Sequence, residues 1–209
     1  MNTIKKILPL LLAVALLLSM TACGGTSAKD VKPLLAGELE ANYHGILDDE
    51  FAKKTDADEA YVAEVYQDTL DVETESFMNA AEIEDDAAGT YSARIQAVFA
   101  ELYPQTKWEI GDGAEKSTDC YAYTVTIYPL DVMDKLSALI DEAEMDPDIE
   151  DFEVAWAEMF VGCLEEAATD VGYKDPVEIS CEVYKDSSDN LWVTDSEAIG
   201  DVYAELIPY

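Results

Sequence analysis

Three kinds of side chain in this 209-residue sequence could do chemistry: carboxyls, thiols and one imidazole. There are 46 acidic residues, four cysteines and a single histidine, His44. The sequence contains no Gly-x-Ser-x-Gly elbow, paired-cysteine metal spacing, His-Glu-x-x-His motif or phosphate-binding loop. Any chemistry must therefore come from carboxyls, from a thiol or from binding alone.

The thiol of Cys23 has the most specific surroundings. An almost entirely apolar run from 7 to 20 follows two lysines, and Thr21 and Ala22 place small side chains directly before the cysteine. This pattern resembles the lipoprotein signal peptides of bacteria, which end in a cleavage box ahead of a cysteine. It predicts that residues 1–22 are removed and that Cys23 receives a diacylglyceryl group and fatty chains such as palmitate.

Two other interpretations of this segment fit less well. An ordinary secretory peptide cut after Ala22 would need a small residue in place of Met20. A membrane-spanning helix needs about 20 apolar residues, and this run is shorter and contains Pro9. We therefore expect a lipid anchor at the outer face of the cell membrane, followed by a flexible tether over residues 23–33.

The charge of the remaining chain excludes one class of partner. Removal of two lysines with the signal would leave ten basic residues against 46 acidic ones, a formal charge of −36. Such a surface is repelled by nucleic acid phosphates and by anionic lipid headgroups, because both require a basic patch. We predict no nucleic acid partner, and a membrane contact made through the lipid. The hydrophobic fraction of 49% argues against disorder.

Hydrophobic periodicity predicts helices and strands in alternating groups. The expected helices lie at 35–55, 56–81, 91–102, 133–143, 149–171 and 196–206, with Pro104 and Gly172 as stops. The expected strands lie at 107–110, 121–127, 177–184 and 191–194, and Gly111-Asp112-Gly113 is predicted to be a hairpin turn between the first two.

The order ααα-ββ-αα-ββ-α indicates an α+β fold, with an antiparallel sheet of about four strands covered by amphipathic helices. We expect one acidic domain over residues 34–209, with a subdivision near 129 as the alternative. Cys120 and Cys181 alternate with different residue sets in their strands, which places them on opposite faces of one sheet and argues against a disulfide between them.

Possible polar sites are weakly defined. His44 has Glu40 one turn before it and Asp48 one turn after it, which favours a surface or structural role. The segment 186–197 imitates a calcium-binding loop but has Leu191 where glycine is needed, and the segment 146–157 fails in the same way. No metal or cofactor site is predicted, and 46 carboxyls cannot identify a catalytic pair.

Four aromatic residues are the remaining candidates for ligand contact: Trp108, Tyr121, Tyr123 and Tyr184. On one exposed face of the sheet they would suit a sugar or a peptide. Facing the helices they would be ordinary core, which is the more common arrangement for aromatic rings. The exposure of these four side chains decides between ligand contact and core.

The chain as a whole is similar to uncharacterised lipoproteins of Gram-positive anaerobes. The likeness lies in the segment 97–103 (AVFAELY), the strand region 123–131 (YTVTIYPLD) and a closing hairpin with Trp192. The resemblance implies a surface-anchored, non-enzymatic domain and brings no activity with it. We therefore expect a domain that binds an envelope protein, a peptide or a glycan. The alternatives are an envelope hydrolase that uses carboxyls and a surface cation-binding protein.

Overall fold

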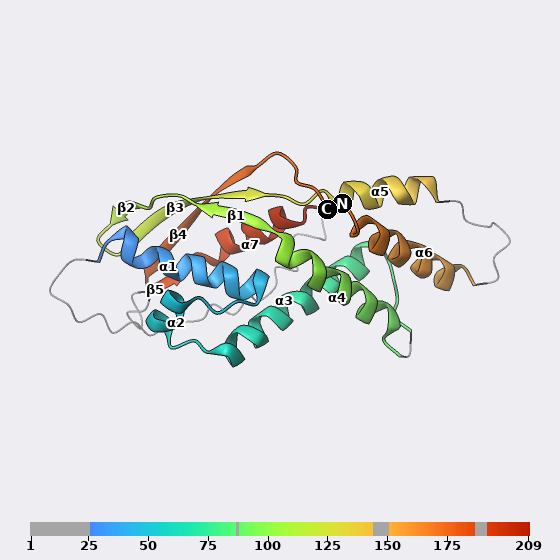
Figure 1. The fold of residues 1–209 in the computed structure, drawn as a ribbon, viewed down its shortest axis with the longest axis horizontal. Coiled ribbons are helices and arrows are strands. Elements are labelled where there is room, and N and C mark those ends of the chain that lie inside the picture. The colour runs from blue at the N-terminus through green and yellow to red at the C-terminus, as the bar shows by residue number, and fades with distance from the viewer. Residues whose placement is uncertain (1–25, 87, 144–150, 187–191) are drawn as a thin grey trace.

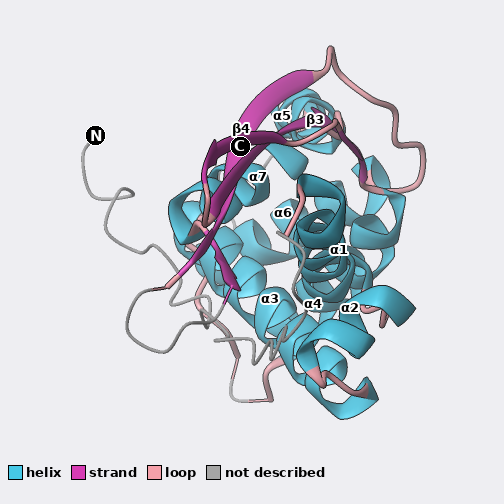
Figure 2. Cartoon of the chain, turned by 90° about the vertical axis from the view of Figure 1, so that its left-hand side faces the viewer, coloured by secondary structure: helices cyan, strands magenta, loops and turns pink. Residues whose placement is uncertain are grey.

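The computed structural model describes residues 26–86, 88–143, 151–186 and 192–209. Within these ranges, seven α-helices and a curled five-stranded antiparallel sheet form an α+β fold, which confirms the predicted class. The helices lie against one side of the sheet, and α5 and α6 extend away from it at one end of an elongated molecule (Figures 1 and 2).

The first predicted helix is two helices. α1 (Ala28–Leu39) continues into a π-helical turn at Glu40–His44, and α2 (Asp49–Thr55) follows. The break falls at Gly45, whose φ of 63° is in the left-handed region that glycine adopts most easily. Asp48 then caps α2 by accepting from the amides of Glu50 and Phe51. The predicted end at Thr55 is confirmed.

The predicted tether is too long. α1 begins at Ala28, and the carboxylate of Asp30 accepts from the amide and the hydroxyl of Ser27 at 2.9 Å and 2.5 Å. Residues 28–33 are therefore helical, even though Pro33 lies among them. Cys23 lies outside the described residues.

The next two helices follow the prediction closely. α3 (Glu59–Ala80) begins after the capping residue Asp58, and α4 (Thr90–Leu102) ends before Pro104, which lies in a 3₁₀ turn at Tyr103–Gln105. The side chains of these helices that point inward join one hydrophobic core, which also contains residues of the sheet and of α7.

The sheet has five strands: β1 (Lys107–Ile110), β2 (Ala114–Ser117), β3 (Cys120–Tyr128), β4 (Val177–Lys185) and β5 (Trp192–Thr194). β1 and β2 both pair with β3, so the predicted hairpin turn at 111–113 is wrong. That segment instead joins two successive strands along one edge of β3. β2 gave no signal in the sequence because all four of its residues are exposed.

Three helices complete the fold: α5 (Val132–Glu142), α6 (Phe152–Ala167) and α7 (Ser196–Leu206). α6 ends five residues before Gly172, so Gly172 is not its stop. Instead the Gly172 amide donates to Asp131 at 2.8 Å, and a Cβ at that position would lie 2.9 Å from the same carboxylate. Among the described residues, no helix is both long enough and apolar enough to cross a membrane.

Candidate functional site: an acidic and aromatic cleft

The four aromatic residues predicted from the sequence do not share a face. Tyr121 and Tyr123 are buried on the side of the sheet that faces the helices, and Trp108 pairs with Ile127 on that same side. Tyr184 pairs with Cys120 and points to the other side, where it is 38% exposed. Trp108, Tyr121 and Tyr123 therefore belong to the core, which is the more common arrangement named above, and Tyr184 is the exception to it.

These core rings hold the start of α1 against the sheet. The Tyr123 hydroxyl donates to the carbonyl of Ala28 at 2.6 Å, and the Tyr121 hydroxyl donates to that of Thr26. The contact is close because Gly113 leaves room for the Tyr123 ring, which lies 2.4 Å from where a Cβ would be. Their role is structural.

His44 is also built into the structure. Its Nδ1 lies 2.8 Å from the Glu40 carboxylate, as the helical spacing predicted, and its Nε2 lies 3.1 Å from the Thr106 carbonyl oxygen. The ring stacks on Trp108 with 4.4 Å between centroids. Asp48, the other predicted neighbour, caps α2 instead. With both nitrogens engaged, the imidazole joins the π-helical turn after α1 to the start of β1.

Metal ligands do not converge in the part of the chain that the structure describes: no three His, Cys, Asp or Glu side chains form a group that could hold an ion. Residues 146–150 and 187–191 of the two calcium-like segments lie outside the described residues. Cys120 and Cys181 are both free. Cys181 is buried beside Tyr123 and Cys120 lies on the opposite face, as the alternation of their strands predicted.

A large hollow with both charged and apolar walls lies between the α3–α4 connection and the first turns of α6. Its volume is about 700 Å³. We call it the acidic–aromatic cleft. Its acidic wall consists of Glu82, Glu84, Asp85, Asp86 and Glu153, and its apolar wall consists of Tyr91, Phe152, Val154 and Trp156.

The apolar wall is exposed to solvent at its outer end. Phe152 is 59% exposed and Val154 is 49% exposed, which is unusual for large apolar side chains on a helix. Phe152 stacks on Trp156 with 6.2 Å between centroids, and Trp156 lies 5.3 Å from Phe160. The Trp156 indole donates to the carbonyl of Ala81 at 2.9 Å, which fixes this aromatic row against the end of α3.

Two of the five acids are committed to the backbone. The Asp85 carboxylate accepts from the amide of Tyr91, and the Asp86 carboxylate accepts from the amides of Ala88 and Thr90 at the start of α4. The Thr90 amide is the main reason that the pKa of Asp86 is lowered, because it stabilises the charged form. These bonds order the cleft wall. Glu82, Glu84 and Glu153 are left facing solvent.

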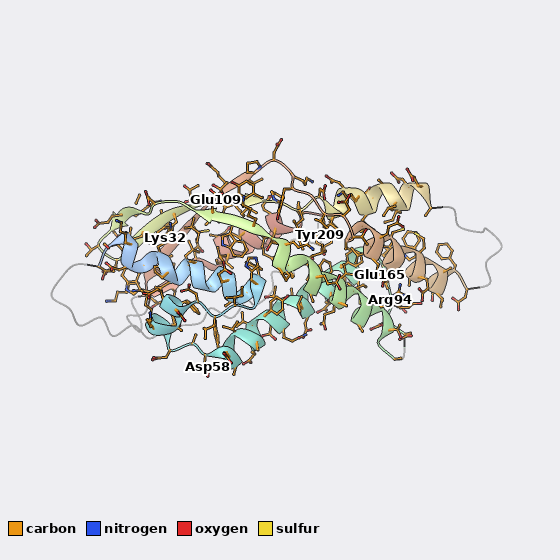
Figure 3. All side chains as sticks on the ribbon, in the orientation of Figure 1. Lys32, Asp58, Arg94, Glu109, Glu165 and Tyr209 are labelled. Carbon is orange, nitrogen blue, oxygen red and sulfur yellow. The ribbon has the colours of Figure 1, made fainter. Side chains whose placement is uncertain are left out.

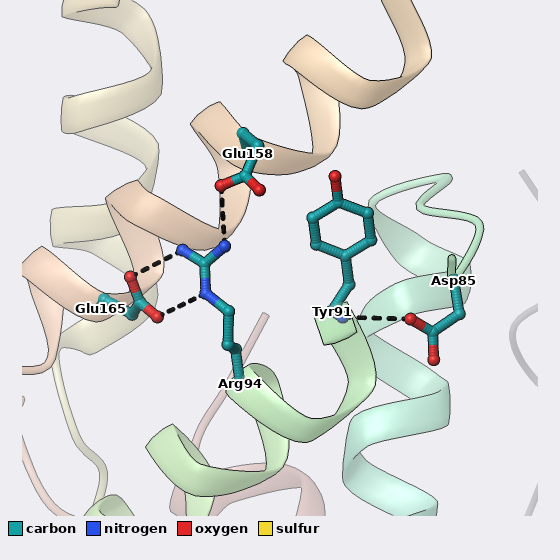
Figure 4. Close-up of polar contacts among 5 residues, drawn as sticks. All are labelled: Asp85, Tyr91, Arg94, Glu158 and Glu165. Atoms are coloured by element: carbon teal, nitrogen blue, oxygen red, sulfur yellow. Dashed lines mark hydrogen bonds and ion pairs between the residues drawn. The ribbon is translucent and has the colours of Figure 1, made fainter. Parts of the chain in front are cut away.

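A charged clamp below the cleft fixes α4 against α6. Arg94, the only arginine in the sequence, donates to both oxygens of Glu165 at 2.8 Å and 2.9 Å and to Glu158 at 2.7 Å. Figure 4 shows this clamp beside Tyr91, and Figure 3 shows Arg94 and Glu165 between the two helices. Hydrogen bonding to Arg94 lowers the pKa of Glu165. The two helices that carry the apolar wall are therefore held at a set spacing.

A second unusual carboxyl, Glu73, lies inside the core. It is 2% exposed and accepts from the Tyr103 hydroxyl at 2.8 Å and from the Tyr209 hydroxyl. Burial raises the pKa of Glu73. It does not face the cleft, and its contacts are those of a structural group.

The sequence interpretation missed the cleft. Phe152, Trp156 and Phe160 were expected to be one buried stripe of a helix, but the row becomes more exposed toward Phe152. One signal was present: α6 also carries a large apolar residue at Val154, on the side of the helix opposite to that stripe. A helix that is apolar around most of its circumference has either a deeply buried position or a further contact surface.

Comparisons with known proteins show that this chain shares its fold with a solved structure. The sequence matches no protein-family model and no curated protein sequence. Among solved structures, the fold is similar to the crystal structure of ycdA from Bacillus subtilis subsp. subtilis str. 168, described as a "putative lipoprotein". The TM-score is 0.62 at 14% sequence identity, over 86% of this chain and 56% of the ycdA chain. This chain thus spans little more than half the length of ycdA.

Proposed function

We propose that this protein is a lipid-anchored domain at the outer face of the cell membrane, and that it binds a partner through the acidic–aromatic cleft. Exposure of Phe152 and Val154 within a hollow whose other wall is acidic is the observation that carries the proposal. Exposed apolar side chains gathered at one place mark an interaction site, because burying them against a partner removes their unfavourable contact with water.

The geometry of the cleft supports binding. The α4 cap and the Arg94 clamp fix both walls before any partner arrives, so binding does not require the walls to be ordered first. The aromatic row offers flat apolar area, and the free carboxylates at its edge favour a partner that carries positive charge. The cleft therefore suits a basic, partly apolar segment of another envelope protein.

The lipid anchor is supported by the sequence around Cys23 and by the likeness of the fold to that of ycdA. Mass spectrometry of the protein isolated from its native membrane tests it directly. We expect a first residue, Cys23, that carries fatty acyl chains. A cytosolic chain that retains Met1 would refute this part of the proposal.

Cross-linking in intact cells tests the cleft. The double variant Phe152→Ala and Val154→Ala removes the exposed apolar wall, and Tyr184→Ala removes a comparably exposed ring from the far face of the sheet as a matched control. We expect one set of cross-linked proteins with the wild type and with the control, and its loss with the double variant. Recovery of the same set from all three would contradict binding in the cleft.

Neither alternative function gains support from the geometry. A carboxylate hydrolase needs two acids held at a set separation across a cleft, but the two acids of this cleft that hydrogen bonds hold in place, Asp85 and Asp86, are sequence neighbours on one wall and are engaged by amides of the α4 cap. A cation site needs several ligands around one point, and the described residues contain no such group.

A further inference from the structure

A second hollow lies next to the cleft. It is an apolar cavity of about 310 Å³ formed where α3, α5 and α6 meet. We call it the apolar cavity, and its walls include Phe77 and Ala81 from the end of α3, Met133, Leu136 and Ile140 from α5, and Phe160 from α6. Its volume exceeds that of a leucine or phenylalanine side chain, and its lining offers such a side chain apolar contacts on several sides.

The apolar cavity and the cleft share a wall. Phe160 lines the cavity and lies against Trp156, which lines the cleft. Ala81 lines the cavity, and its carbonyl accepts the indole hydrogen of Trp156. The aromatic row of α6 thus runs from one hollow into the other. From Phe152 to Phe160 the helix rises about 12 Å, at about 1.5 Å per residue.

The charge around the two hollows has one sign. Asp141 stands at the edge of the apolar cavity, and Glu82, Glu84 and Glu153 stand at the edge of the cleft. Among the described residues that line either hollow, none is basic. Arg94 lies close by, but its guanidinium group is already paired with Glu158 and Glu165. An occupant with positive charge beside its apolar groups would complement both edges.

We propose that the two hollows form one groove for a basic amphipathic helix of the partner. One apolar side chain would enter the cleft against Phe152, and a second, two helical turns away, would enter the apolar cavity. Side chains seven residues apart on a helix lie on one face and about 10.5 Å apart, which matches the spacing of the hollows along α6. This inference rests on the proposed function and names the kind of partner.

Binding of synthetic peptides to the folded domain tests the groove. The probe is a fluorescein-labelled helix of about 16 alanines and lysines, a length at which an isolated helix begins to form, with two leucines seven positions apart. Companion peptides have one leucine replaced by alanine, all lysines replaced by glutamate, or a central proline. Fluorescence anisotropy gives the affinity of each.

Two protein variants and one matched control separate the roles of the two hollows. Ser137→Trp places a large ring from exposed Ser137 of α5 into the apolar cavity, and Ala138→Trp places the same ring on the exposed neighbour that does not line it. Phe152→Ala removes the contact in the cleft. Circular dichroism and the unfolding midpoint of each variant establish that it is folded.

We expect the two-leucine peptide to bind the wild type at least about tenfold more tightly than the one-leucine peptide, as burial of one apolar side chain implies. Ser137→Trp should remove this difference, and Ala138→Trp should preserve it. The glutamate and proline peptides should bind at least about tenfold more weakly.

Equal binding of the one-leucine and two-leucine peptides, or an unchanged preference in Ser137→Trp, would overturn the use of the cavity. If Phe152→Ala still weakened binding in that case, the proposed function would stand without the second anchor. If Phe152→Ala changed the affinity of no peptide, the proposed function would itself fail. Equal binding of the proline peptide would show an extended occupant, and equal binding of the glutamate peptide would refute charge complementarity.

Discussion

Replacing Glu73 by glutamine should make the domain less sensitive to rising pH. The carboxyl is buried in the core, and its two oxygens accept from Tyr103 and Tyr209. Burial disfavours the charged form, so the pKa of Glu73 is raised above its ordinary value of 4.5. In the folded chain this group therefore keeps its proton at pH values where the unfolded chain has lost it.

The direction and size of the effect follow from proton binding. Between the ordinary pKa and the raised one, the folded state holds the extra proton, so the free energy of unfolding falls as pH rises. The stabilisation is fully present below pH 4.5 and is lost as pH passes the raised pKa. Within that window one group contributes at most about 1.4 kcal/mol per pH unit. Glutamine has a similar shape and does not ionise.

Urea denaturation followed by tryptophan fluorescence from pH 5 to pH 8 measures this effect. We expect the free energy of unfolding of Glu73→Gln to exceed that of the wild type by an amount that grows with pH. Glu178→Gln, on the exposed face of β4, removes the same charge and should change stability by less than about 0.5 kcal/mol at every pH. A difference for Glu73→Gln that is flat, or that shrinks with rising pH, would refute the reasoning.

Three other predictions concern packing and reactivity. Arg94→Ala should lower the free energy of unfolding by about 1 kcal/mol in chemical denaturation, a modest value because the ion pairs are partly exposed. Arg94→Lys should recover less than half of that loss, because lysine lacks the planar fork that engages Glu165. Gly37→Ala should lower the free energy of unfolding by about 2 kcal/mol in the same assay, because a Cβ there would lie 2.1 Å from the Cβ of Phe51. A loss below about 0.5 kcal/mol would contradict this and show that α1 and α2 can move apart at little cost in stability. In the folded protein at pH 8, Cys181 should be the last thiol modified by iodoacetamide, because burial raises its pKa to about 12. Mass spectrometry of the timed reaction measures the order of modification. Reaction of Cys181 as fast as half-buried Cys120 would contradict the prediction.

The helices and the long strands were predictable because their residues report burial directly. In β3, every second residue is large and buried: Tyr121, Tyr123, Val125 and Ile127. Alternate residues of a strand lie on the same face of the sheet, so this pattern in the sequence predicted the buried face. β2 was missed because each of its side chains faces solvent and only its backbone pairs with β3. Pairing of this kind leaves no hydrophobic pattern.

The break after α1 shows a different limit. The apolar spacing from Leu35 to Phe51 continues through Gly45, because both helices turn apolar side chains to the same core. Periodicity therefore cannot detect that the backbone changes direction there. Gly45 itself was visible, but a glycine within a helical pattern ends a helix in some chains and is tolerated in others.

The sequence by itself determined the predicted membrane location and the negative charge of the surface. The pattern before Cys23 is read as a linear motif, and an excess of acids gives a negative surface however the chain folds. The folded arrangement alone decided the candidate site. Glu82 and Glu84 of the α3–α4 connection meet Phe152 of α6, some 70 residues away, because packing of α3, α4 and α6 brings them together. Whether Phe152 is core or contact surface depends on how much of α6 its neighbours cover, and local spacing does not contain that information.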